Sequence, residues 1–170
     1  GEGNNTASFV GNAFAGNTVA CSGRDQACPG GSVVIDGGNS SFNNDTFSGN
    51  VGNNMSAADL YVTASGADLT LRGVTFNMSN IGVAVSSAIS SGASFSCPAG
   101  QQVANVSSVA QVTYSCQRCP KSTYLVHNGT LELGATGSKC LPCPFGGECS
   151  GGGDAVSATA GYWGSLAADD

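Results

Sequence analysis

A short phrase recurs through the first half of the chain, in which a phenylalanine is followed three or four residues later by an asparagine. The full phrase stands at Phe14-Ala-Gly-Asn17, Phe47-Ser-Gly-Asn50 and Phe76-Asn-Met-Ser-Asn80, and Phe9-Val-Gly-Asn12 is an echo of it. Successive full phrases lie 33 and then 29 residues apart, which is typical of one structural unit repeated along a chain. Units of this size cannot bury a core alone, so they stack on one another.

The hydrophobic pattern within each unit is that of β-strands. Apolar and polar residues alternate at Leu69-Thr-Leu71 and Val74-Thr-Phe76, and short apolar runs opened by small residues occupy 30–35 and 57–62. Stacked strands place inward Val, Ile, Leu and Phe in columns, while Gly and Asn accommodate the corners. We therefore expect an all-β fold with a short β-solenoid over residues 1–95. A β-sandwich with Gly-Asn hairpins is the alternative.

Four asparagines of these phrases are predicted to be structural. Stacked Asn side chains at the corners of a repeat bind backbone groups that would otherwise lack hydrogen-bond partners. A ligand-binding stripe is the alternative use of the same side chains. The four residues are Asn12, Asn17, Asn50 and Asn80.

The second half of the chain is rich in cysteine. The eight cysteines of the whole chain form an even, closely spaced set, which is typical of disulfides in an oxidising compartment. Residues 96–170 hold too few large apolar side chains for an independent core, so we expect a small disulfide-rich, loop-dominated module there. The sequence leaves the connectivity open, and we favour the sequential order Cys21–Cys28, Cys97–Cys116, Cys119–Cys140 and Cys143–Cys149.

A zinc site is the competing use of four of these cysteines. Cys116-Gln-Arg-Cys119 and Cys140-Leu-Pro-Cys143 are spaced like the paired ligands of a zinc ribbon. Two further cysteines flank the pairs and a glycosylation motif lies between them, which favours disulfides, because zinc thiolates occur mainly in reducing compartments. We expect no metal and no cofactor.

Seven Asn-x-Ser/Thr motifs predict a glycoprotein, where chance would give about three. Only 9% of the residues are charged, and covalent N-glycans would supply the solubility that charge does not. Together with the cysteines, the motifs indicate an extracellular or cell-surface location. The predicted acceptors, which we expect to face solvent, are Asn4, Asn39, Asn44, Asn54, Asn77, Asn105 and Asn128.

Composition argues against several classes of partner. The chain has five Lys and Arg residues and a formal charge of −6, which is too little positive charge for nucleic acid or an anionic membrane surface. No apolar run approaches the ~18 residues that a spanning helix needs. The sequence starts at Gly1 without a signal peptide, which indicates a processed chain or a part of a longer one.

Few residues suit catalysis, and we expect no enzymatic activity. A polysaccharide-cleaving site needs two carboxylates about 5–9 Å apart, and Asp36 with Asp59 is the pair that neighbouring units could bring together. The acids stand beside Gly and Asn, where turn-forming Asp is common. The single histidine, His127, precedes a turn and has no nucleophile to activate. The full candidate set is Asp36, Asp45, Asp59 and Asp68, with Arg24 and Arg72 as positive groups.

Both halves resemble known families. The strand-and-phrase units of residues 9–95 are similar to the repeats of polymorphic outer-membrane-type proteins and of pectin-lyase-like right-handed β-helices. Residues 97–164 resemble ephrin-receptor-like cysteine-rich repeats, through Cys97-Pro-Ala-Gly and through Cys143-Pro-Phe-Gly-Gly-Glu-Cys149 ahead of Gly161-Tyr-Trp. The combination is similar to large surface proteins of algae and protists, including mastigoneme-like proteins.

The resemblance implies a right-handed solenoid and an extracellular, glycosylated, structural or adhesive role, and it carries over no catalytic residue. The first unit has no polar cap before it, so its strand edges are expected to pair with another chain. Head-to-tail docking of unlike faces gives an open polymer. We predict a self-associating structural subunit of a glycosylated filament or surface coat. A monomeric adhesion or receptor ectodomain and a polysaccharide-active enzyme are the alternatives.

Overall fold

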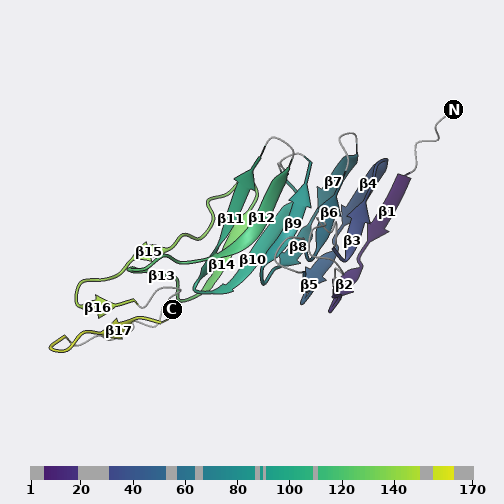
Figure 1. Cartoon of the computed structure of the whole chain (residues 1–170). Coiled ribbons are helices and arrows are strands. Elements are labelled where there is room, and N and C mark those ends of the chain that lie inside the picture. The colour runs from purple at the N-terminus through teal and green to yellow at the C-terminus, as the bar shows by residue number, and fades with distance from the viewer. Residues whose placement is uncertain are drawn as a thin grey trace, which may run out of the picture.

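The computed structural model of the chain is all-β and elongated, with the N-terminus at one end and the small strands β16 and β17 at the other (Figure 1). It describes residues 6–18, 31–52, 57–63, 67–86, 89, 91–108, 111–149 and 155–162. Most described strands lie in sheets whose pairs are mostly parallel, and three disulfides cross-link the later part. The predictions for Asn4, Arg24, Asn54 and the Cys21–Cys28 pair fall outside the described residues.

Three sheets receive successive strands in a repeating order along the chain. The first sheet is parallel and contains β1 (Thr6–Val10), β4 (Asn39–Asn43) and β7 (Asp68–Arg72). The second, ordered β14-β10-β8-β5-β2, contains β2 (Ala13–Ala15), β5 (Thr46–Ser48), β8 (Val74–Asn77), β10 (Ala93–Ala99) and β14 (Asn128–Glu132). The third, ordered β11-β12-β9-β6-β3, contains β3 (Val33–Ile35), β6 (Leu60–Val62), β9 (Ile81–Val85), β11 (Gln101–Ser107) and β12 (Val112–Arg118). We call these three sheets the body.

The repeated phenylalanines form the centre of the core. Parallel pairing aligns Phe14 with Phe47, Phe47 with Phe76, and Phe76 with Phe95. The rings stack with centroids 4.7, 4.8 and 5.2 Å apart, and Tyr114 adds a fifth ring 4.5 Å from the ring of Phe95. The distances among the four phenylalanine rings match the separation of neighbouring strands, so each added strand of the second sheet carries its ring onto the previous one, whereas the Tyr114 ring comes from β12 of the third sheet. We call these five rings the ring column.

The direction of strand pairing tests the β-sandwich of hairpins, which was the alternative expected from the sequence. Among strands β1 to β9 every described pair is parallel, and each pair joins strands from different repeats. A sandwich of Gly-Asn hairpins would pair consecutive strands antiparallel, so that alternative is wrong for this part of the chain. At the corners the chain turns through residues with positive φ instead, such as Asn44 at 55° and Gly73 at 63°.

The boundary predicted between residues 95 and 96 falls inside β10. This strand pairs in parallel with β8 and antiparallel with β14, and the hairpin of β11 and β12 extends the third sheet beyond β9. The sheets therefore continue into the cysteine-rich region, where Cys97 and Tyr114 join the core of the first half.

Beyond the body the strands become very short. Residues 119–127, 134–149 and 155–162, which we call the tail, contain two antiparallel pairs. One joins β13 (Thr123–Tyr124) to β15 (Leu141–Pro142), and the other joins β16 (Gly147–Glu148) to β17 (Ser157–Ala158). Cys119 and Leu125 are the buried hydrophobic residues of the described tail, which therefore depends on covalent cross-links more than on a core.

Candidate functional site

The end of the body nearest the N-terminus has three strand edges without a partner among the described residues. The strands β1, β2 and β3 are the terminal strands of the three sheets, and they lie together at this end (Figure 1). An unpaired edge carries backbone N–H and C=O groups that can bind another strand. We call this surface, made by residues 6–17 and 33–35, the open end.

Core side chains at the open end lack the layer that covers their counterparts. Phe9, Phe14 and Val33 are only partly buried, whereas the residues aligned with them one repeat later are fully enclosed. The ring of Phe9 stacks on the ring of Phe42, with centroids 4.7 Å apart, and meets the ring of Phe14 edge-on, with centroids 5.8 Å apart. The open end therefore exposes aromatic core surface as well as strand edges. The enclosed counterparts are Phe42, Phe47 and Leu60.

A ladder of polar side chains reaches the same end. Asn12 donates hydrogen bonds from its backbone N–H and its Nδ2 to Asp45 Oδ1, at 2.6 and 3.1 Å. Asn17 donates in the same way to Asn50 Oδ1, at 2.9 and 3.0 Å. These bonds confirm the structural role predicted for Asn12, Asn17 and Asn50, although Asn50 is buried and Asn12, Asn17 and Asn80 are exposed. Within the described residues the side-chain oxygens of Asn12 and Asn17 accept no hydrogen bond, so they are available to N–H groups of an added strand.

Asp59 is a buried acid that belongs to this ladder. It is 1% exposed, its Oδ1 accepts a hydrogen bond from Asn50 Nδ2 at 2.7 Å, and its Oδ2 has no hydrogen-bond partner among the residues that the structure describes. Burial raises the pKa of Asp59 to about 6, and the hydrogen bond from Asn50 opposes that rise. A Cβ at residue 82 would collide with Asp59 Oδ2 and with Met78, which explains the glycine there. Asp59 therefore lies in a bend directly before β6, as its neighbours suggest, but its carboxyl group is enclosed in the interior.

The carboxylates considered for catalysis do not share a groove. Asp45 and Asp59 are buried, whereas Asp36 and Asp68 are exposed. Asp36 follows β3 and is hydrogen-bonded to Thr63, which follows β6. Asp59 directly precedes β6, so Asp36 and Asp59 lie at opposite ends of the β3–β6 pair. The possibility that neighbouring units bring these two carboxylates together for catalysis is therefore wrong.

The other polar candidates lie on the surface. Arg72 is exposed at the end of β7, and His127 is exposed with its Nδ1 3.0 Å from the backbone oxygen of Asn128. Within the described ranges, no group of three or more His, Cys, Asp or Glu residues could hold a metal ion. In the same part of the chain, no helix has the length and hydrophobicity needed to cross a membrane.

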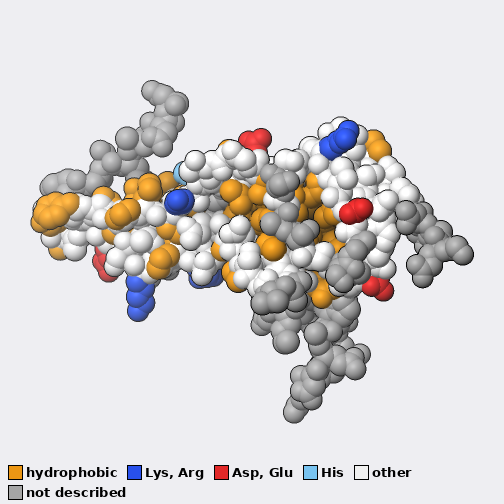
Figure 2. All heavy atoms as spheres, turned by 90° about the horizontal axis from the view of Figure 1, so that it is seen from above, with side chains coloured by type: hydrophobic (Ala, Val, Ile, Leu, Met, Phe, Trp, Pro, Cys, Tyr) orange, Lys and Arg blue, Asp and Glu red, His pale blue; other side chains and the backbone are white. Residues whose placement is uncertain are grey.

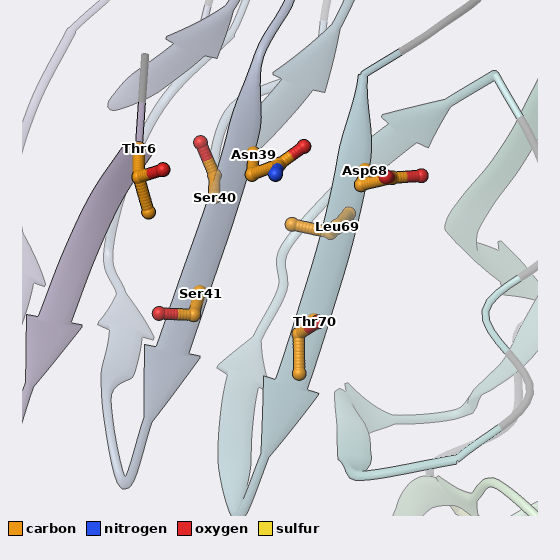
Figure 3. A pocket seen from close by; sticks show the side chains of 7 residues that line it. All are labelled: Thr6, Asn39, Ser40, Ser41, Asp68, Leu69 and Thr70. Atoms are coloured by element: carbon orange, nitrogen blue, oxygen red, sulfur yellow. The ribbon is translucent and has the colours of Figure 1, made fainter. Parts of the chain in front are cut away.

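A polar groove of about 350 Å³ crosses the first sheet (Figure 3). Pairing aligns Thr6, Asn39 and Asp68 in one row across the three strands, and aligns Ser41 with Thr70 two residues further along. Hydroxyl, amide and carboxylate groups suit a hydroxylated ligand, and the groove includes a predicted glycan acceptor. It offers one acid, which is not enough for the two-carboxylate chemistry considered above. The lining residues are Thr6, Asn39, Ser40, Ser41, Asp68, Leu69 and Thr70.

None of the predicted glycan acceptors within the described residues is on β1, β2 or β3. Asn39 is half-buried on β4, where it pairs with Thr6 of the open end and lines the same groove. The other four are exposed: Asn44 follows β4, Asn77 lies on β8, Asn105 on β11 and Asn128 on β14. Sugars at Asn77, Asn105 and Asn128 would therefore surround the sides of the body, whereas a sugar at Asn39 would lie next to β1.

The described cysteines form three disulfides in the sequential order favoured from the sequence. These are Cys97–Cys116, Cys119–Cys140 and Cys143–Cys149, and none of the described cysteines is free. Each Cys-x-x-Cys motif is divided between two disulfides, so the zinc alternative is wrong for these residues. Three disulfides indicate an oxidising environment.

Two exposed apolar features were not identified from the sequence. Val34 is 46% exposed and Val33 only partly buried in an apolar run typical of a buried strand, because β3 has a described neighbour on one side only. Phe145 is 92% exposed in the loop closed by Cys143 and Cys149. That exposure depends on the closure of the loop by Cys143–Cys149, a pairing that the sequence alone left open.

In comparisons with known proteins, no family model, no curated protein and no solved structure matches the chain.

Proposed function

We propose that the chain is a structural subunit of an extracellular, glycosylated filament or surface coat, and that copies assemble head to tail through the open end. In this proposal the body is a right-handed β-solenoid, whose faces are the three sheets and whose coils are the repeats. The observation that carries the proposal is the coincidence of three unpaired edges with uncovered aromatic core at one end. An added layer of chain would satisfy the edges and cover the rings together.

The asymmetry of the body supports this direction of assembly. At the far side the second and third sheets end in β14 and β11, which run antiparallel to their neighbours β10 and β12. Each of these two edge strands carries a predicted glycan acceptor, Asn128 on β14 and Asn105 on β11. Bulky or irregular features on edge strands discourage pairing, and the open end has none among its described residues. Two unlike ends favour a heterologous contact, which repeats without closing.

The same features support an extracellular, non-catalytic role. Disulfides persist in oxidising compartments, and the Asn-x-Ser/Thr motifs become acceptors along the secretory route. Two of the four candidate acids, Asp45 and Asp59, are buried. Asp45 accepts hydrogen bonds from the backbone N–H groups of Asn12 and Asn43. We infer that these acids stabilise the corners of the repeats rather than act on a substrate.

The proposal is tested by the assembly of oxidised protein secreted from a glycosylating host. Sedimentation velocity and negative-stain electron microscopy should show regular polymers above a critical concentration. Ala7→Lys would place a charge on the core side of β1, where residue 7 is exposed in a single copy but would be covered in the polymer. Because burying an unpaired ammonium is costly, we expect the critical concentration to rise at least about tenfold.

A second variant tests edge pairing. Gly16 N–H donates to Ser48 on β5, so strand alternation turns the N–H of Ala15 toward the unpaired edge. Ala15→Pro removes that donor without breaking a bond inside the body, and Ala15→Val keeps it. Polymers should be lost in the proline variant and retained in the valine variant. Val126→Lys, an exposed tail position, controls for added charge. A wild-type protein that stays monomeric at high concentration would contradict the proposal and favour a monomeric adhesion or receptor ectodomain.

A further inference from the structure

The tip of the tail displays an aromatic pair on a constrained loop. Cys143 and Cys149 close the loop, and Phe145 at its apex is 92% exposed. The ring of Tyr162 meets the ring of Phe145 edge-on, with centroids 5.4 Å apart and planes at 89°. Gly146, whose φ is 75°, lies so close to the Tyr162 ring that a Cβ would collide with it. The disulfide and this packing hold Phe145 outward. We call Phe145 and Tyr162 the aromatic tip.

Such exposure is unusual for a phenylalanine in a short loop. Hydrophobic side chains gather at the end of the molecule formed by the tail (Figure 2), where Leu141 is also about half exposed. Exposed aromatic side chains that contact each other, as Phe145 and Tyr162 do, are typical of interaction sites. An aromatic ring that is already held in place loses little conformational entropy on binding, which is the property of an interface anchor.

Charge selects the partner of the aromatic tip. Copies of this chain carry a formal charge of −6 and therefore repel one another, so a contact between copies needs surfaces poor in charge. Residues 141–149 contain one charged side chain, Glu148, and the described residues 155–162 contain none. Residues 6–17 and 33–35, which make the open end, contain none. These two surfaces, with one charged side chain between them, lie at opposite ends of the elongated molecule (Figure 1).

The open end offers the aromatic tip a matching environment. The ring column ends at Phe14, which is only partly buried, and Phe9 lies beside it in the same state. Within the body each such ring is covered by another ring at 4.5 to 5.2 Å. A ring supplied from outside would complete the same stacking arrangement, which contributes about 0.5–1.5 kcal/mol beyond the area buried.

We propose that the aromatic tip of one copy docks on the open end of a second copy, with Phe145 covering Phe9 and Phe14. This inference rests on the proposed function and names the surface that occupies the open end. The short strands β16 and β17 would then lie near the edges of β1 and β2 and supply backbone groups to them. Because the two surfaces differ and lie at opposite ends, the contact is heterologous and propagates as a filament.

A photo-crosslinking experiment tests the contact directly. Phe145 is replaced by a benzoyl-phenylalanine probe in the full, oxidised chain, and the protein is mixed with isotope-labelled wild-type copies before irradiation. Crosslinked peptides identified by mass spectrometry should join residue 145 of one copy to residues 6–17 or 33–35 of another. The same probe at Val106 on β11, an exposed position on the body, should give no such product. Crosslinks from residue 145 to any other surface, or only within its own copy, would overturn the proposal.

A pair of substitutions separates this inference from the proposed function. Phe145→Ala should raise the critical concentration for assembly at least about tenfold, while Phe145→Leu, which keeps apolar bulk, should raise it less. If Phe145→Ala assembles like wild type while Ala7→Lys does not, the open end is the assembly surface but the aromatic tip is not its occupant. If wild type neither assembles nor crosslinks, both ideas fail. Binding of wild-type protein to neutral lipid vesicles, lost in Phe145→Ala with no crosslink between copies, would identify a membrane as the occupant instead.

Discussion

The body and the tail of this molecule are held together by different means. In the body, four of the five stacked rings and the surrounding aliphatic residues are buried between three sheets, and Phe42, Phe47 and Phe76 have no exposed surface. The tail has two-residue strands, two disulfides of its own and few buried side chains. Burial acts on the folded state, whereas a disulfide acts mainly by restricting the unfolded chain. The two regions should therefore respond differently to the same kind of change.

The largest contrast is expected between two phenylalanines. Phe47→Ala removes the second ring of the ring column, which contacts rings on both sides, and should lower the free energy of unfolding by about 4 kcal/mol. Phe145→Ala in the tail should change it by less than about 0.5 kcal/mol, because the side chain is exposed. Chemical denaturation followed by tyrosine fluorescence measures both. Equal losses would show that the tail shares the core of the body.

The next effect concerns pH and belongs to the body alone. The pKa of Asp59 rises from 3.8 to about 6 on folding, so the folded protein keeps this proton over a range where the unfolded chain has released it. The free energy of unfolding should therefore fall as pH increases from about 4 to about 7. A shift of about two pKa units corresponds to about 3 kcal/mol.

The matched variant for this pH dependence is Asp59→Asn, which keeps the shape and the acceptor for Asn50 but cannot ionise. Denaturation midpoints at pH 4 and pH 7 should converge in the variant relative to wild type. The pair of Asp36 and Asp36→Asn serves as a surface control, because Asp36 is exposed. An unchanged pH dependence in Asp59→Asn would mean that this carboxyl group is solvated or paired in solution.

A smaller and more local effect is expected from the last disulfide. Cys143→Ser combined with Cys149→Ser opens a loop with a sequence separation of 6 residues, and the chain-entropy relation gives about 2 kcal/mol. Hydrogen exchange should accelerate around β16 and β17, while the denaturation midpoint of the body stays unchanged. If the denaturation midpoint of the body also falls in this variant, the body and the tail unfold as one cooperative unit.

The smallest effect concerns glycines at turns. Gly73 has a φ of 63°, and a Cβ there would collide with the side chain of Asn44, so Gly73→Ala should destabilise the body by about 1 kcal/mol or slightly more. Gly134 in the tail has a φ of 96° with open space around it. Gly134→Ala should leave the global denaturation midpoint where it is, since the strain would be confined to the tail. A lower midpoint in Gly134→Ala than in Gly73→Ala would reverse the comparison.

Much of the body could be predicted from the sequence because its repeat is simple. The spacing of Phe14, Phe47 and Phe76 equals the offset of paired strands, so the phrase by itself aligns the rings. The continuation through Phe95 and Tyr114 was not visible, since these residues are spaced differently and lie beyond the change to a cysteine-rich pattern. Local sequence marks the end of a repeat but not the end of a core.

The interior acids and the tip of the tail show why the rest could not be predicted. Asp59 and Asp68 both stand beside small or turn-forming residues, yet one is buried and the other exposed. The difference depends on which way the chain turns at each corner. Strand register determines that direction, and composition does not. The disulfide order could be predicted because cysteines close in sequence meet first. The exposure of Phe145 could not, because it depends on which side chains the closed loop leaves in contact with solvent.

The orientation of the strands has a mechanical consequence. The strands of the body run across the long axis of the molecule, so the hydrogen bonds between them run along that axis (Figure 1). Tension applied between the two ends would load these bonds one strand at a time, beginning with β1, and would draw the body out stepwise. The segments closed by Cys97–Cys116, Cys119–Cys140 and Cys143–Cys149 cannot lengthen beyond their covalent links. Stretching would therefore unfold the aromatic repeats first, while the cross-linked region would remain as an inextensible anchor.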